Sequence, residues 1–210
     1  MYLIRAPLWM RILYQKGRWK MPSMQPPSVY ITFDDGPHPT ITPQVLELLR
    51  THRAKATFFC IGKNVSENAS VYQDILAQGH AIGNHTQHHL NGWKTNAQDY
   101  IADVQKAALE INSRLFRPPY GRIKPSQARQ LNKLGYNLVF WSLLSGDFDI
   151  NITPEECCNN VITHLKPGDI VVFHDSQKAA PRMLYALPQV LKYCMEKGWE
   201  MRSLDVLKIH

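Results

Sequence analysis

The sequence lacks a long apolar run, a Cys-x-x-Cys pair and a compact basic cluster, and each absence excludes a class of protein. Its four cysteines, at positions 60, 157, 158 and 194, include no Cys-x-x-Cys pair. A cysteine-based zinc site is therefore not expected, and nothing demands an oxidising compartment. No internal repeat or low-complexity segment is evident, so the chain is expected to be an ordinary globular protein.

The composition fits this interpretation. Of the 210 residues, 44% are hydrophobic and 20% are charged, and the length suits one domain with a sizeable core. The formal net charge of +7 at pH 7 predicts attraction to acidic surfaces. Because no basic run or module of aromatic residues and arginines accompanies this charge, nucleic acid is not expected as a partner.

The first twenty residues are apolar, aromatic and basic. Arg5 and Arg11 interrupt the apolar run, which is too short to span a membrane and carries no small-residue cleavage site. The segment is expected to pack on the main domain as a first strand or helix; the alternative is peripheral contact of residues 1–20 with a membrane surface. No export signal is expected, so a cytoplasmic or membrane-surface location is favoured.

Prolines at positions 22, 26 and 27 predict a linker, which divides the chain into an N-terminal segment and linker (1–27) and a main domain (28–210). In this domain, runs typical of strands alternate with runs typical of helices. The strands are expected at residues 29–33, 56–61, 80–84, 115–116, 136–142, 169–173 and 199–204. The helices are expected at 42–51, with Thr42 as N-cap, and at 64–78, 96–114, 125–134, 153–165 and 180–197. This alternation predicts an α/β fold with a parallel sheet of about seven strand-helix units, near the count that closes a barrel.

Polar motifs follow the predicted strands at their carboxyl ends. They are Asp34-Asp35, the histidines of His85-Thr-Gln-His-His89, Arg117-Pro-Pro-Tyr120, Asp147 and His174. Because the carboxyl ends of parallel strands form one edge of a barrel, these side chains are expected to share one mouth.

A metal site is predicted from Asp35, His85 and His89. The two histidines lie four residues apart, which suits one face of a helical turn, and with Asp35 they make a two-histidine, one-carboxylate set that leaves positions open for water and substrate. His88 competes, because 85/88 is also a helical pair; the 85/89 pair is preferred. The other interpretations are a polar Asp-Asp-Gly turn and a surface pair of histidines.

The remaining motifs supply acid–base chemistry beside that ion. Asp34 can take the proton of an attacking water, and Arg117 can pair with Asp34 and keep it ionised. The backbone N–H of Tyr120, held by the stiff proline pair before it, can donate to an oxyanion. His174 can protonate a leaving nitrogen or oxygen.

Four of these motifs, in order, carry a family resemblance: Thr32-Phe-Asp-Asp-Gly36, His85-Thr-Gln-His-His89, Arg117-Pro-Pro-Tyr-Gly121 and Ile170-Val-Val-Phe-His174. The sequence resembles the polysaccharide deacetylases of carbohydrate esterase family four over about residues 28–208. The resemblance implies a distorted seven-stranded (β/α) barrel that removes acetyl groups from an N- or O-acetylated oligo- or polysaccharide, such as chitin, peptidoglycan or xylan. It also implies the roles given above, with a divalent ion bound by Asp35, His85 and His89: zinc, with cobalt or nickel as alternatives.

One motif departs from the family pattern Asp-x-x-Asp-Trp. Here Leu144 replaces the first aspartate, Asp147 keeps the second, which orients the acid His174, and Phe148 replaces the tryptophan. Val172 stands where the family often has leucine. The residues expected to bind the substrate are Phe148, Val172, Tyr120 and Pro119. Because the pocket differs from the family pattern, the identity of the substrate is left open. Two alternative functions are an inactive glycan-binding protein on the same fold and an amidohydrolase acting on a small non-sugar amide.

Overall fold

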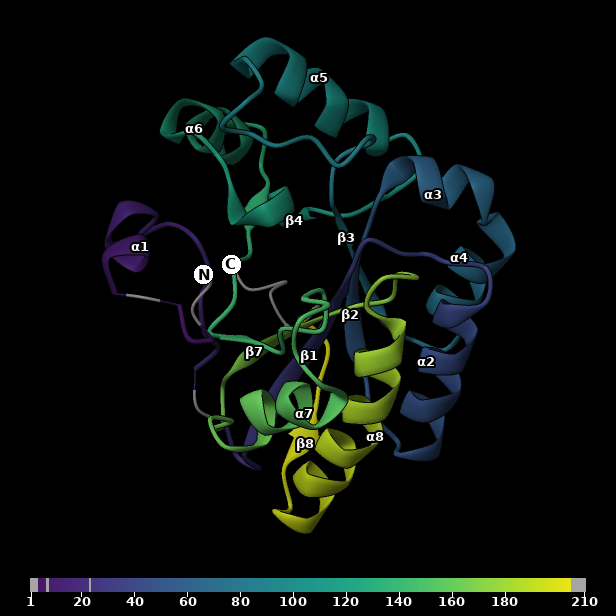
Figure 1. Ribbon diagram of the computed structural model, residues 1–210. Coiled ribbons are helices and arrows are strands. Elements are labelled where there is room, and N and C mark those ends of the chain that lie inside the picture. The colour runs from purple at the N-terminus through teal and green to yellow at the C-terminus, as the bar shows by residue number, and fades with distance from the viewer. Residues whose placement is uncertain (1–3, 7, 23, 205–210) are drawn as a thin grey trace.

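A single curled sheet of parallel strands forms the centre of the protein. The computed structural model describes residues 4–6, 8–22 and 24–204. The strands are β1 (Ser28–Asp34), β2 (Ala56–Cys60), β3 (Ala81–Asn84), β4 (Leu115–Phe116), β5 (Asn137–Leu138), β6 (Leu143–Leu144), β7 (Ile170–His174) and β8 (Glu200–Met201). They lie in the order β5-β4-β3-β2-β1-β7-β6, and β8 pairs with the start of β1. The predicted α/β, barrel-like fold is confirmed, as a half-barrel with β5 and β6 at its two ends (Figure 1).

Most of the helices connect the strands and cover the outside of the curl. They are α1 (Leu8–Leu13), α2 (Ile41–Thr51), α3 (Gly62–Glu67), α4 (Ala69–Ala77), α5 (Ala97–Ala107), η1 (a 3-10 helix, Pro119–Gly121), α6 (Pro125–Lys133), α7 (Pro154–Ile162) and α8 (Ala180–Glu196). Figure 1 shows α2, α7 and α8 beside β1 and β7, and α5 and α6 together at the opposite end of the molecule. No described helix has both the length and the apolar character needed to cross a membrane.

Strand β1 is buried along its whole length because both of its faces are covered. Val29, Ile31 and Phe33 belong to the cluster that packs against the outer helices, whereas Tyr30 belongs to a different cluster on the concave face. Side chains alternate along a strand, so Asp34 also points to the concave side, at the carboxyl end. The sequence of β1 thus directs a carboxylate into the interior of the curl.

Most predicted elements have slightly different boundaries in the structure, and three of them are clearly shortened or divided. The strand expected at 136–142 is two short strands, β5 and β6, and the helix expected at 96–114 ends at Ala107. The helix expected at 64–78 breaks at Asn68 into α3 and α4, where the Asn68 side chain donates to the backbone carbonyl of Asn64 at 3.0 Å. Asparagine competes with helical hydrogen bonds in this way.

The N-cap predicted for α2 is wrong. The helix begins at Ile41, with Thr40 at the N-cap position, while the hydroxyl of Thr42 donates to Asp175 at 2.5 Å. Thr42 is drawn into this contact by a carboxylate that is distant in sequence, which local capping rules do not take into account.

The N-terminal residues lie across the open side of the half-barrel. The carbonyl of Ile4 accepts from the backbone N–H of Leu144 at 2.8 Å, and Arg18 exchanges backbone hydrogen bonds with Leu138 and Phe140, both at 2.8 Å. The segment therefore bonds to the chain at both free ends of the sheet, next to β5 and at β6. Residues 1–3 and 7 of the predicted segment, and 205–210 of the predicted main domain, lie outside the described residues.

Removing the N-cap of α7 is expected to destabilise the fold measurably. The hydroxyl of Thr153 accepts from the N–H of Glu156 at 3.1 Å, and the Glu156 carboxylate accepts from the N–H of Thr153 at 2.7 Å. Thr153→Ala should lower the free energy of unfolding by about 1 kcal/mol, measured by urea denaturation. Thr40→Ala is the matched control, because Thr40 makes no side-chain capping bond, and an equal loss in both variants would contradict this account.

Candidate active site

The site begins where β1 ends and the chain turns. Asp35 has φ of 80°, in the left-handed region, so the turn brings both Asp34 and Asp35 to one cavity although neighbouring strand residues point apart. The backbone N–H of Gly36 donates to the Asp175 carboxylate at 3.0 Å, and a Cβ atom at Gly36 would collide with that carboxylate. Glycine is therefore required here by the close approach of Asp175, the residue after β7, to the turn.

Asp35, His85 and His89 converge as the predicted metal site requires. One ligand atom from each lies within 4.8 Å of the others: Oδ1 of Asp35 is 3.2 Å from Nε2 of His89 and 3.8 Å from Nε2 of His85. Oδ1 is buried and accepts no hydrogen bond from any described residue. A buried, unpartnered carboxylate oxygen is costly, and a divalent cation would satisfy it. These donors fit such an ion.

The two histidines are oriented through their other ring nitrogens. Nδ1 of His85 donates to the carbonyl of Arg117 at 2.7 Å, and Nδ1 of His89 lies 3.0 Å from the hydroxyl of Tyr120. Both Nε2 atoms are therefore directed toward Asp35. In metal sites, a hydrogen bond to the other ring nitrogen commonly fixes the imidazole of a ligating histidine in this way.

Local electrostatics favour the ligand forms of these groups. Burial lowers the pKa of His85 to about 4 despite the nearby carboxylates, so its imidazole is neutral at pH 7. Burial alone would raise the pKa of Asp35, but His89, His174 and His85 together lower it below the usual range. A neutral imidazole and an ionised carboxylate are the forms that bind metal ions.

The helical turn predicted for residues 85–89 is wrong, although the residues chosen from it do meet. Thr86 and His89 have φ of 67° and 55°, so the segment is an irregular loop. Asp103 of α5 organises this loop by accepting from the backbone N–H of Gln87 at 2.9 Å and of His88 at 3.0 Å. Nδ1 of His88 lies 2.5 Å from the same carboxylate, which draws this competing histidine away from the triad.

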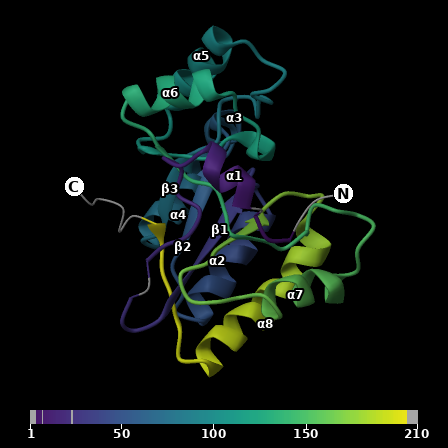
Figure 2. The ribbon, with the colours of Figure 1, turned by 90° about the vertical axis from the view of Figure 1, so that its left-hand side faces the viewer.

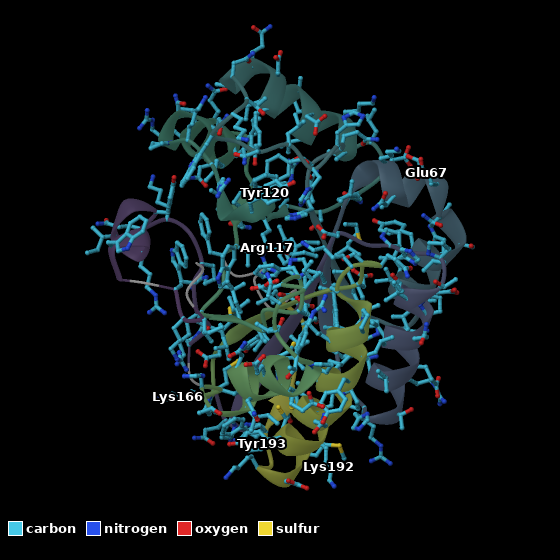
Figure 3. All side chains as sticks on the ribbon, in the orientation of Figure 1. Glu67, Arg117, Tyr120, Lys166, Lys192 and Tyr193 are labelled. Carbon is cyan, nitrogen blue, oxygen red and sulfur yellow. The ribbon has the colours of Figure 1, made fainter. Side chains whose placement is uncertain are left out.

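Asp34 is held by the most deeply buried cation among the described residues. Nη1 of Arg117 lies 2.7 Å from Oδ1 of Asp34 and donates equally closely to the hydroxyl of Thr32. The guanidinium also donates to the carbonyl of Phe140 at 3.0 Å and lies over the ring of Phe59, 4.1 Å from its centroid. Arg117 is wholly buried, near the centre of the molecule in Figure 3. These contacts fix the Asp34 carboxylate against the guanidinium at the edge of the cavity.

His174, at the end of β7, forms the opposite side of the site. Asp147 accepts from Nδ1 of His174 at 2.8 Å and from its backbone N–H at 2.6 Å. Burial opposes the charged imidazolium, but Asp147, Asp35 and Asp34 outweigh burial and raise the pKa of His174 to about 10. The ring of Phe148 meets the imidazole edge-on at 5.3 Å. His174 is thus protonated at neutral pH, with Nε2 left free of Asp147.

One cavity of about 910 Å³ connects these groups. Its lining includes the predicted residues Asp34, Asp35, His85, His89, Tyr120, Phe148, Val172 and His174. Arg117 and Asp147 lie behind the lining, against Asp34 and His174. Pro119, predicted to bind substrate, is buried at the start of η1 and does not line the cavity. Figure 3 shows Tyr120 on η1, above Arg117.

Sequence reasoning missed several residues of this site. Thr32 lies two positions before Asp34 on the same face of β1, so the alternation of strand side chains could have indicated its contact with Arg117. No sequence pattern indicated the roles of Asp103 and Asp175, because each accepts a hydrogen bond from a loop that is distant in sequence. Trp9 and Trp141 also line the cavity.

The metal-free protein is expected to bind one Zn²⁺ ion through the triad. His89→Ala should weaken binding by at least about 100-fold, since it removes a ligand rather than an outer partner, as measured by calorimetric titration. His88→Ala is the control, because His88 contacts Asp103 and not Asp35. A stronger effect in the His88 variant than in the His89 variant would contradict the site.

Comparisons with known proteins place the chain in a family. A family model described as polysaccharide deacetylase matches residues 22–139, more than half of the chain. A peptidoglycan-N-acetylglucosamine deacetylase of Bacillus cereus is 36% identical over 195 residues, covering 90% of this chain and 91% of the relative. A chitooligosaccharide deacetylase of Azorhizobium caulinodans is 39% identical over 155 residues, covering 70% and 73%.

Solved structures show the same fold. The crystal structure of the Bc1960 peptidoglycan N-acetylglucosamine deacetylase, in complex with 4-naphthalen-1-yl-N-oxidanyl-benzamide, matches with a TM-score of 0.87 and 27% identity over 96% of both chains. A mutant of BA3943, described as a family pseudoenzyme with restored enzymatic activity, matches with a TM-score of 0.74 and 25% identity, covering 86% of this chain and 66% of that one. From these matches in sequence and fold, the chain belongs to the polysaccharide deacetylases, hydrolases that act on carbohydrate amide bonds.

Proposed function

We propose that this protein is a metal-dependent deacetylase that hydrolyses the N-acetyl group of N-acetylglucosamine units in an oligo- or polysaccharide. The observation that carries the proposal is the convergence on one cavity of the unpartnered Asp35 oxygen with its two histidines, the Asp34–Arg117 pair and the His174–Asp147 pair. The relatives named for peptidoglycan and for chitooligosaccharide share N-acetylglucosamine, which supports this sugar.

The mechanism follows from the positions of the side chains. A divalent ion held by Asp35, His85 and His89 would supply Lewis acidity to the acetyl carbonyl and to a water molecule; zinc suits the two-nitrogen, one-oxygen donor set, with cobalt and nickel as alternatives. Asp34, positioned by Arg117, takes a proton from the water as the water oxygen attacks the carbonyl carbon.

The second half of the reaction uses the other side of the cavity. The backbone N–H of Tyr120 donates to the oxyanion that develops on the carbonyl oxygen. As the C–N bond breaks, Nε2 of protonated His174 gives its proton to the leaving nitrogen, so that acetate and a free amine result. Asp147 holds the imidazole in position and keeps it charged.

The central test is acetate release from N-acetylglucosamine oligomers by the zinc-loaded protein. Chelation with EDTA should abolish release, and added zinc should restore it. Asp34→Asn keeps the size of the side chain but removes the base, so kcat/KM should fall by at least about 100-fold. If the metal-loaded wild type binds the oligomers without releasing acetate, it is a glycan-binding protein. If it hydrolyses small non-sugar amides instead, it is an amidohydrolase of another kind.

The pH profile tests the role assigned to Asp147. Because this carboxylate helps raise the pKa of His174 to about 10, the acid stays protonated, and the wild type should remain active well above neutral pH. Asp147→Asn should return the pKa of His174 toward its ordinary value of ~6.5, which moves the alkaline limb of kcat/KM to lower pH. A limb at the same pH in both enzymes would contradict this role.

A further inference from the structure

We propose that Trp9 forms a sugar-binding subsite in the active-site cavity, at a distance from the reacting acetyl group. This residue would stack on a neighbouring pyranose ring, so the enzyme would prefer oligomers to a single N-acetylated sugar. The inference deepens the proposed function and relies on it for the class of ligand.

The cavity extends beyond what the chemistry needs. Its volume of about 910 Å³ is near the upper end of the ~300–1,000 Å³ found for ligand sites, whereas an acetyl group fills a small part of it. The N-terminal segment contributes Ala6 and Trp9 to its lining. Trp9 is nevertheless 61% exposed, so much of its indole is available to a ligand.

The N-terminal segment is fastened on both sides of Trp9. Before α1, Nη2 of Arg5 lies 3.1 Å from the buried carboxylate of Asp169 and also donates to the carbonyl of His164. After α1, the ring of Trp19 stacks on Phe140 at 4.2 Å between centroids and an angle of 5°. Figure 2 shows α1 in front of the sheet, between α5 and α6 above and α7 and α8 below. These contacts fasten the backbone on both sides of the helix that carries Trp9, which reduces the entropy lost when a ligand orders this part of the cavity.

The chemistry of the lining favours a carbohydrate. Trp9, Trp141 and Tyr120 all line the same cavity as the proposed catalytic groups. A pyranose ring presents its C–H bonds on a face that packs against an aromatic ring, while its hydroxyls point outward to polar groups such as Arg122 and Lys178, which also line the cavity. A cavity lined by both aromatic rings and charged side chains matches this two-sided ligand better than it matches a uniformly apolar ligand.

Ile12, on the same short helix, provides a matched control. It is 60% exposed but lines a different hollow, beside Tyr14 and Leu138, and not the active-site cavity. Membrane contact through α1 would be expected to use both exposed apolar side chains, whereas a sugar subsite needs Trp9 alone.

The experiment compares Trp9→Ala, Trp9→Phe and Ile12→Ala with the parent protein, all in the Asp34→Asn background to prevent turnover and all loaded with zinc. Binding of N-acetylglucosamine and of its pentamer is measured by calorimetry. Trp9→Ala should raise the Kd of the pentamer about tenfold and leave that of the monomer unchanged. Trp9→Phe should lose less, and Ile12→Ala should lose nothing.

Three results would overturn the proposal: no binding of the pentamer by the parent, an unchanged pentamer Kd in Trp9→Ala, or an equal loss for monomer and pentamer, which would indicate a general distortion. Binding to phosphatidylglycerol vesicles that falls alike in the Trp9 and Ile12 variants, with oligomer binding unchanged, would assign α1 to a membrane surface instead. Since binding is measured without turnover, a wild type that releases no acetate refutes the proposed function and leaves the Trp9 subsite to be decided by these Kd values.

Discussion

The buried ion pair between Arg117 and Asp34 is the interaction on which the site depends. A wholly buried guanidinium is tolerated only when its charge and its N–H groups are satisfied, and removing the partner of such a pair typically costs about 3–5 kcal/mol. Arg117 meets this condition through Asp34, Thr32 and the carbonyl of Phe140. These partners come from two separate parts of the chain, so the same bonds that solvate the cation also join β1 to the residues after β5.

The backbone of Arg117 extends this connection to the metal site. Its carbonyl accepts from Nδ1 of His85 at 2.7 Å, so one residue positions both the proposed base and a proposed metal ligand. Asp175, the residue after β7, accepts from Gly36 and Thr42 and so holds the turn that follows Asp34 and Asp35. Catalytic geometry is thus maintained by groups that do not touch the substrate, which is how preorganised sites are generally held.

The sequence predicted the fold class and the meeting of the polar motifs because both follow from strand-helix alternation and the shared edge of a parallel sheet. It could not predict how the loop from His85 to His89 folds. A spacing of four residues suits a helical turn, but two residues in the left-handed region produce the same convergence. What decides the conformation is Asp103, on a helix formed later in the chain, and no local pattern reveals that contact. The strand expected at 136–142 is likewise two short strands with distant partners, because β5 pairs with β4 whereas β6 pairs with β7.

The pairing of Arg18 with Leu138 and Phe140 has a consequence for the order in which the protein is assembled. During synthesis Ile4 and Arg18 emerge before the sheet, yet the backbone groups that bind them, at Leu144, Leu138 and Phe140, emerge only after most of the sheet. Contacts between residues so far apart in sequence form slowly. The segment that carries Trp9 therefore cannot make both sets of bonds until Leu144 has been synthesised, so the part of the cavity lining that it contributes is added after most of the strands have emerged.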